Sequence, residues 1–156
     1  MYKALQQGFT LVELIVVIVI LGILAATALP RFINVTTDAR TASVQGFAGG
    51  LRSAVSVVQS KWMVAGSSGS TVVSMADGTT VVVSSGAAGG IPITGAADTT
   101  GITAAMRCES ATACQGYTLV QTGTTATFTP SGGSGTCQVV YTAATGNVAP
   151  TTSNCN

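Results

Sequence analysis

Few residues in this chain could do chemistry, and its four cysteines are the most informative of them. Cys108, Cys114, Cys137 and Cys155 lie in the last third of the 156 residues, and none is part of a CxxC pair. This spacing argues against a zinc site and against thioredoxin-like redox chemistry. An even number of cysteines in a Ser/Thr/Gly-rich region favours disulfides formed in an oxidising compartment. Three pairings are possible; chain proximity favours Cys108–Cys114 with Cys137–Cys155, but the sequence alone does not settle the choice.

The rest of the composition excludes several classes of function. The chain has no histidine, so Ser–His–Asp and Cys–His nucleophile arrangements and His-ligated metal sites are impossible. The net charge is +1, and the sequence has no cluster of lysines and arginines of the kind that neutralises phosphates, which argues against nucleic-acid binding. The acids Asp77, Asp98 and Glu109 are isolated in the sequence, and a calcium site near the last two lacks the ligand density that calcium needs. We therefore expect no enzymatic activity, no cofactor and no metal.

One carboxylate, that of Glu13, lies inside an apolar run. Residues 14–30 carry no charge and would span about 26 Å as a helix, close to the ~30 Å hydrocarbon core of a bilayer. A lone acid there costs roughly 2.5–3.5 kcal/mol, and the segment itself supplies no partner. Glu13 therefore indicates a contact with another molecule. The alternative is that its side chain snorkels to the membrane surface.

An ordinary secretory signal peptide is the plainest alternative for this apolar run. Lys3 precedes it, and Ala26-Thr27-Ala28 is similar to a cleavage site, after which the mature chain would begin at Leu29. An acid near the start of the apolar stretch is unusual for a signal peptide. Apolar residues also continue beyond Pro30 in a helical pattern, which argues against cleavage there.

A specific string surrounds Glu13. This string is Gly8-Phe9-Thr10-Leu11-Val12-Glu13-Leu14, and an apolar run follows it. It resembles the processing and assembly motif of bacterial type IV prepilins, and the eight residues that end at Gly8 resemble the short leaders of the type IVa class. Over roughly residues 9–66 the chain also resembles the mannose-sensitive haemagglutinin pilins, at Pro30-Arg31-Phe32-Ile33-Asn34, Asp38-Ala39-Arg40, Gln45-Gly46 and Ser60-Lys61. The C-terminal half resembles pilins only in architecture and cysteine placement.

The resemblance implies roles for individual residues. A membrane prepilin peptidase would cut after Gly8 and methylate the new amine of Phe9, leaving residues 9–156. Glu13, with Thr10 as a further assembly residue, would act in polymerisation: Glu13 of an incoming subunit would pair with the Phe9 amine of the subunit before it. The helix would unwind locally between Gly22 and Pro30 inside the filament; the alternative is a static kink at the proline.

The elements that must position these residues follow from periodicity. From Ile33 to about Ala65 the pattern is that of an amphipathic helix, which ends at the Gly/Ser-rich residues 66–70. Its apolar stripe, in which we expect Trp62 to be a core residue, consists of Val44, Phe47, Leu51, Val55, Val58 and Trp62.

Strand signals follow the helix. We expect two hairpins, a further strand with three side chains on one face, and one short helix. The first hairpin pairs Thr71–Met75 with Thr79–Ser84, and the second pairs Tyr117–Gln121 with Thr125–Thr129. The further strand is Cys137–Thr142, which places Cys137, Val139 and Tyr141 on one face. The short helix is Thr99–Met106. We expect Ser85–Ala97 and Ala143–Asn156 to be loops.

The predicted fold class is α+β, a type IV pilin fold. A long N-terminal α-helix packs on a four- to five-stranded antiparallel sheet with a disulfide-bounded C-terminal loop. The expected division is a leader at 1–8, a hydrophobic transmembrane and filament-core helix at 9–32, an amphipathic helix half at 33–66, and a globular β-sheet region at 67–156.

The resemblance implies a structural subunit of a type IV pilus, or fimbrium, used for adhesion or surface motility. Its partners would be copies of itself, the bacterial inner membrane before assembly, the prepilin peptidase and the pilus assembly machinery; its final location would be extracellular. The first alternative is the major pseudopilin of a type II secretion system, and the second is a monomeric membrane-anchored adhesin. Two disulfides and a loop-rich C-terminal region favour the pilus over the pseudopilin.

Overall fold

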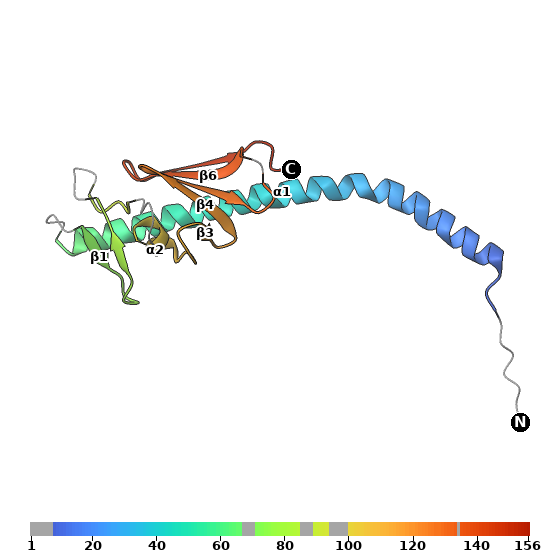
Figure 1. Ribbon diagram of the computed structural model, residues 1–156, viewed down its shortest axis with the longest axis horizontal. Helices are drawn as coiled ribbons and strands as arrows, with labels where there is room; N and C mark the ends of the chain where they lie inside the picture. Colours follow the sequence, from blue (N-terminus) through green and yellow to red (C-terminus); the bar gives the residue numbers. More distant parts are fainter. Residues whose placement is uncertain (1–7, 67–70, 85–88, 94–99, 134) are drawn as a thin grey trace, which may run out of the picture. The chain divides into compact units, whose positions relative to one another are not determined.

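A computed structural model describes residues 8–66, 71–84, 89–93, 100–133 and 135–156, with side chains described throughout except at 29–34 (Figure 1). The chain divides into two compact units, residues 1–36 and 37–156. Helix α1, Leu11–Val64, contributes residues to both. Each unit is therefore considered by itself.

The described part of the first unit is the beginning of helix α1. Thr10 caps the helix, because its hydroxyl accepts a hydrogen bond from the Glu13 backbone N–H at 3.3 Å and so satisfies one of the free donors of the first turn. The backbone stays helical through Gly22 and Pro30. Proline removes one helical hydrogen bond but does not end this helix. The unwinding expected between these two residues concerns the filament and stays a prediction.

The second unit is built on residues 37–64 of helix α1. Val44, Ala48, Leu51 and Val55 are buried in one core cluster, and Val58 is buried in a second. The predicted apolar stripe is thus confirmed, with Ala48 as an unpredicted member. Phe47 and Trp62 are only partly buried, each packed against one of the clusters.

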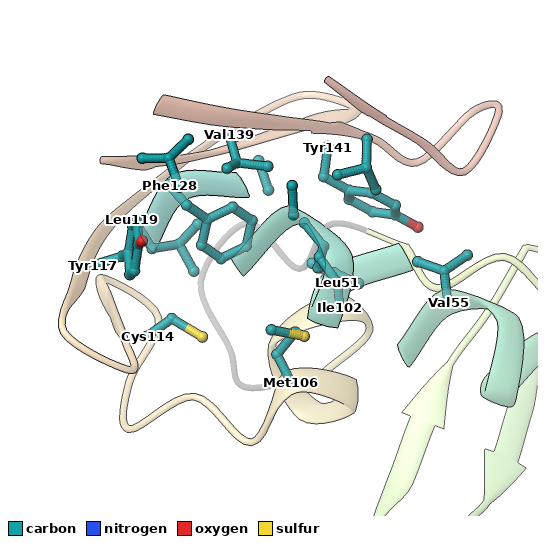
Figure 2. Packing of buried hydrophobic residues seen from close by; sticks show 14 of the residues in the cluster. Leu51, Val55, Ile102, Met106, Cys114, Tyr117, Leu119, Phe128, Val139 and Tyr141 are labelled. Carbon is teal, nitrogen blue, oxygen red and sulfur yellow. The ribbon is translucent and has the colours of Figure 1, made fainter. Parts of the chain in front are cut away.

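A five-stranded antiparallel sheet supplies the other side of the main core. Its strands lie side by side in chain order: β3 (Ala113–Cys114), β4 (Tyr117–Thr122), β5 (Thr125–Pro130), β6 (Cys137–Thr142) and β7 (Asn147–Thr152). Burial alternates along β6, where Cys137, Val139 and Tyr141 are fully buried, as the sequence predicts. Figure 2 shows Phe128, Val139 and Tyr141 from the sheet, together with Leu51 from the helix, in this core.

The prediction that residues 143–156 form a loop is wrong, because β7 pairs with β6 over its whole length. Gly146 adopts φ of 70° in the turn between the two strands, a conformation that glycine adopts without strain. Pro150 weakened the strand signal. It is tolerated because β7 is an edge strand and needs ladder hydrogen bonds on one side only.

A smaller hairpin covers the end of the helix. The predicted first hairpin is confirmed but shorter at its ends: β1 (Val72–Ser74) pairs with β2 (Thr80–Val82), and Val73, Val81 and Val83 join Val58 in the second cluster. The predicted short helix is α2 (Ile102–Met106), which starts three residues later than expected.

The described part of the predicted loop 85–97, residues 89–93, is more ordered than a simple loop. Pro92 forms an isolated bridge with Val83, and Ile91 is buried in the main core. The remainder of that prediction lies outside the described residues.

Candidate functional site: the apolar helix, its acid and the disulfides

The N-terminal part of helix α1 is an uncovered apolar surface. Its window Leu11–Ala28 has a mean hydropathy of 2.8, and none of it is buried inside the chain. By length and composition it could cross a membrane. A contiguous apolar surface of this size is unstable in water and marks contact with lipid or with another protein. Neither core cluster of the described residues between 37 and 156 includes any of these side chains.

Glu13 lies in the first turn of this apolar helix and is exposed. An acid at this position interacts favourably with the helix dipole, and Thr10 caps the same turn. Across the described residues the structure contains one ion pair, Arg107 with Asp77, and Glu13 is not part of it. The carboxylate is therefore free to meet a cation from another molecule.

Gly8 and Phe9 immediately precede the helix, and both are exposed. Nothing lies within 4 Å of the place where a Cβ at Gly8 would stand. Packing within this chain therefore does not require glycine there, which leaves recognition by another protein as a reason for it. The rest of the predicted leader lies outside the described residues.

Two disulfides link Cys108 to Cys114 and Cys137 to Cys155, with Cα–Cα distances of 4.2 and 4.9 Å. They are the two pairs that chain proximity favours. Cys137 and Cys155 are fully buried, and their bond ties the chain end after β7 to the start of β6. The Cys155 carbonyl also accepts a hydrogen bond from Arg40 of helix α1 at 3.3 Å.

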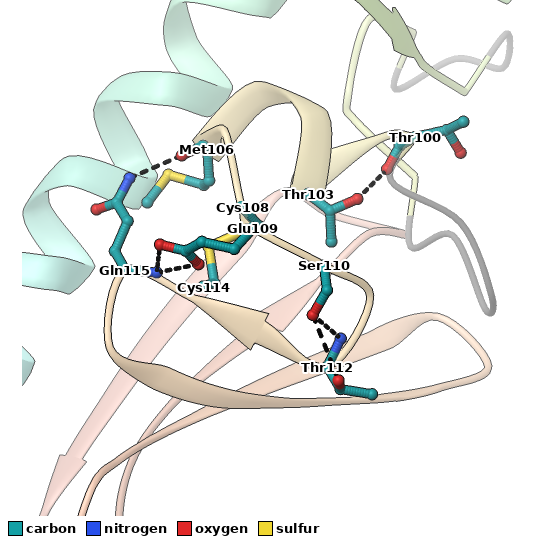
Figure 3. The surroundings of a disulfide bond; sticks show 9 residues. All are labelled: Thr100, Thr103, Met106, Cys108, Glu109, Ser110, Thr112, Cys114 and Gln115. Atoms are coloured by element: carbon teal, nitrogen blue, oxygen red, sulfur yellow. Dashed lines mark hydrogen bonds between the residues drawn. A yellow bond between two sulfur atoms is a disulfide. The ribbon is translucent and has the colours of Figure 1, made fainter.

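The smaller disulfide loop is held by its own polar groups (Figure 3). Both carboxylate oxygens of Glu109 accept from the Gln115 backbone N–H, at 2.8 and 3.1 Å, and the Gln115 side chain donates to the Met106 carbonyl at 2.7 Å. Glu109 therefore closes this loop. Asp98 lies outside the described residues, and within those described no group of three or more Asp, Glu, His or Cys could hold a metal ion.

Sequence analysis missed the structural use of two arginines. Arg52 donates to the Val148 carbonyl of β7 at 2.9 Å, and Arg40 donates to Cys155. Arg40 lies on the face of the apolar stripe, one helical turn before Val44, and Arg52 lies beside the stripe, where a long basic side chain can reach over its edge. Their positions at the end and at the side of the stripe were the available signal, but their targets became visible only with β7 and Cys155 in place.

Comparison with known proteins adds to this geometry. Residues 3–29 match the family described as the prokaryotic N-terminal methylation motif. The chain is 51% identical over 57 residues to the type IV narrow pilus major component PilA5 of Thermus thermophilus, which is 35% of this chain and 49% of the relative. It is 43% identical over 53 residues to the type IV major fimbrial protein FimA of Dichelobacter nodosus, which is 34% of each chain. No solved structure matches the chain.

Each similarity covers about a third of this chain, and the chain spans between a third and a half of the length of these two relatives. About a third of the chain is therefore similar to type IV pilus and fimbrial subunits. The predicted α+β fold class is confirmed, because residues 37–64 of helix α1 pack on a five-stranded antiparallel sheet. The relatives do not specifically support the mannose-sensitive haemagglutinin subtype.

Proposed function

We propose that the chain is a structural subunit of a type IV pilus that polymerises through its N-terminal helix into an extracellular filament for adhesion or surface motility. One observation carries the proposal: an 18-residue apolar helix window, with none of it buried, lies within the matched methylation motif, and the motif contains a single acid, Glu13. The relatives, whose names describe pilus and fimbrial components, support the same assignment. We propose no enzymatic activity.

Processing is the first step of the proposed function. A prepilin peptidase removes residues 1–8 and methylates the Phe9 amine while the apolar helix is held in the inner membrane. The exposed position of Gly8 and Phe9, ahead of the capped first turn, supports access for such an enzyme. The processed subunit then has three parts: the apolar helix at 9–32, the amphipathic helix half at 33–66 and the globular region at 67–156.

Assembly is the second step. Glu13 of an incoming subunit pairs with the Phe9 amine of the subunit before it, as the pilus machinery moves the apolar helix from lipid into the filament. A buried charge without a partner is strongly destabilising, so the pair sets the register in which subunits join. Local unwinding between Gly22 and Pro30 then lets neighbouring helices pack.

Mass spectrometry and imaging of the host test the proposal. Sheared surface filaments should contain a subunit whose intact mass equals residues 9–156 with both disulfides and one added methyl group. A subunit that begins at Leu29 would establish the signal-peptide alternative. A membrane-held protein that never forms filaments in its own host would establish the anchored adhesin. No observation favours the pseudopilin, which short periplasmic filaments would indicate.

A further inference from the structure

The charged side chains of residues 37–156 fall into two groups. Most of those described bond within their own chain: Arg40, Arg52 and Glu109 with backbone groups, and Asp77 with Arg107. Two exposed charges on helix α1, Asp38 and Lys61, make no such bond with any described residue. They carry opposite charges, so each is a suitable partner for the other.

These two residues cannot meet within one chain. They are 23 positions apart on a continuous helix, which places them about 35 Å apart along its axis and about 140° apart around it. They can meet only between two copies. A contact that joins different faces of two copies is heterologous, so it builds a ring or, where the rotation does not close, an open helical polymer, and not an isologous dimer.

The surface around Lys61 is hollowed. A groove of about 490 Å³ lies between helix α1 and the β1–β2 hairpin, lined by Ser53, Ser56, Val57, Ser60, Lys61, Val64, Met75 and Ala76. Val57 and Val64 remain 51% and 84% exposed. The groove therefore offers apolar contact beside a cation. The helix surface around Asp38 suits this groove. Ala42, one turn further along the helix, is exposed and small enough for a second copy to approach the helix closely.

We propose that the Lys61 groove of one copy binds the Asp38 face of helix α1 of a second copy, with the helices parallel and shifted so that Asp38 lies level with Lys61. The parallel orientation rests on the proposed function, since every copy enters the assembly from the same membrane by the same N-terminal helix. The contact gives the filament a second, peripheral register in addition to that set by Glu13.

Charge reversal tests the contact. Lys61→Asp and Asp38→Lys should each lower the filament mass sheared from cells by about fivefold or more, since each replaces an attraction with a repulsion at every subunit. The double variant Asp38→Lys with Lys61→Asp should restore most of that loss. Thr118→Lys and Thr118→Asp, on the exposed face of β4, are the matched controls and should leave filament mass unchanged.

Cross-linking gives a second readout. Asp38→Cys combined with Lys61→Cys should produce a ladder of disulfide-linked subunits in oxidised filaments, whereas either change alone should not. Normal filaments from both single reversals, with no ladder, would overturn the contact and leave the proposed function standing. A loss from Lys61→Asp that Asp38→Lys does not rescue would also overturn it and would indicate another occupant of the groove, such as lipid or an unrelated protein. Failure of the unaltered chain to form filaments would instead refute the proposed function.

Discussion

Glu13 combines two roles that must be separated by experiment. Its backbone N–H donates a hydrogen bond to the capping hydroxyl of Thr10, while its carboxylate is free among the described residues. The first role stabilises a helix end by about 1 kcal/mol. The second, under the proposed function, is a buried ion pair whose half-broken form costs about 3–5 kcal/mol at every subunit. The charge should therefore matter far more than the cap.

Glu13→Ala and Glu13→Gln should both abolish or nearly abolish surface filaments, because each leaves the Phe9 amine of the neighbour uncompensated. Thr10→Ala should reduce filaments less, since it removes only the cap. All three variants should insert in the membrane and form both disulfides, which fractionation and non-reducing electrophoresis can check. Normal filament numbers with Glu13→Gln would refute the pairing mechanism.

Tyr141 is the titratable residue with the clearest effect on stability. It is fully buried on β6, and its hydroxyl donates to the carbonyl of Pro92. Burial raises the pKa of the Tyr141 phenol well above its usual value. The folded state therefore favours the neutral phenol. This stabilisation is complete below the ordinary tyrosine pKa of about 10 and is lost as pH rises beyond it.

Tyr141→Phe should lower the free energy of unfolding by about 1–3 kcal/mol near neutral pH, because the Pro92 carbonyl loses its donor in a buried place. It should also make stability above pH ~10 fall less steeply than in the unaltered chain. Urea unfolding at a series of pH values measures both effects. Val139→Ala, on the same strand and face, is the control that destabilises the core but should keep the alkaline slope.

At the scale of elements, β7 is held by covalent and polar links as well as by its ladder. The disulfide joins Cys137 to Cys155, 18 positions further along the chain, and so closes a loop that contains β7. Arg52 also donates a hydrogen bond to the Val148 carbonyl of β7. Replacing both cysteines of this pair by alanine should cost roughly 3 kcal/mol in the chain-entropy model, against about 2 kcal/mol for the shorter Cys108–Cys114 loop. Denaturant unfolding of the two double variants compares them directly. A larger loss from the shorter loop would contradict this ranking.

The entry into α2 depends on one glycine. Gly101 has φ of 61°, and a Cβ there would lie 2.0 Å from the Ile93 carbonyl oxygen. Gly101→Ala should therefore destabilise the fold by more than the ~1–2 kcal/mol that a left-handed conformation alone costs a residue with a side chain. Gly123→Ala is the matched control, since Gly123 has φ of 56° and open space around it. Equal falls in melting temperature for the two variants would show that the Ile93 backbone can move aside without a cost in stability.

At the scale of the whole molecule, residues 37–156 form a compact unit whose described core draws on none of the apolar window Leu11–Ala28. A chain of residues 37–156, secreted to an oxidising compartment, should therefore be soluble, folded and fully oxidised. Circular dichroism, thiol titration and size-exclusion chromatography test this, with the full-length chain in detergent as the reference. An unfolded or thiol-bearing product would show that the core requires the apolar helix.

Local signals predicted much of this architecture. The apolar run and the stripe from Val44 to Val58 are patterns over many residues, and the helix follows them. The alternation in Cys137–Thr142 and the Ala76-Asp77-Gly78 turn likewise depend on neighbours in the sequence, and both elements are present. The N-terminal motif indicated its family for the same reason, because its residues act as a contiguous string.

Other features were decided by the tertiary structure alone. Asn147–Thr152 has weak strand propensity and contains a proline, so it becomes a strand only because β6 offers a free edge and Cys155 and Arg52 hold the segment there. Four contacts join residues that are far apart in the sequence or separated by loops. They are those of Arg40 with Cys155, Arg52 with Val148, Tyr141 with Pro92 and Gly101 with Ile93. Such contacts depend on chain reversal and packing, and a local pattern carries no information about which distant group will stand opposite.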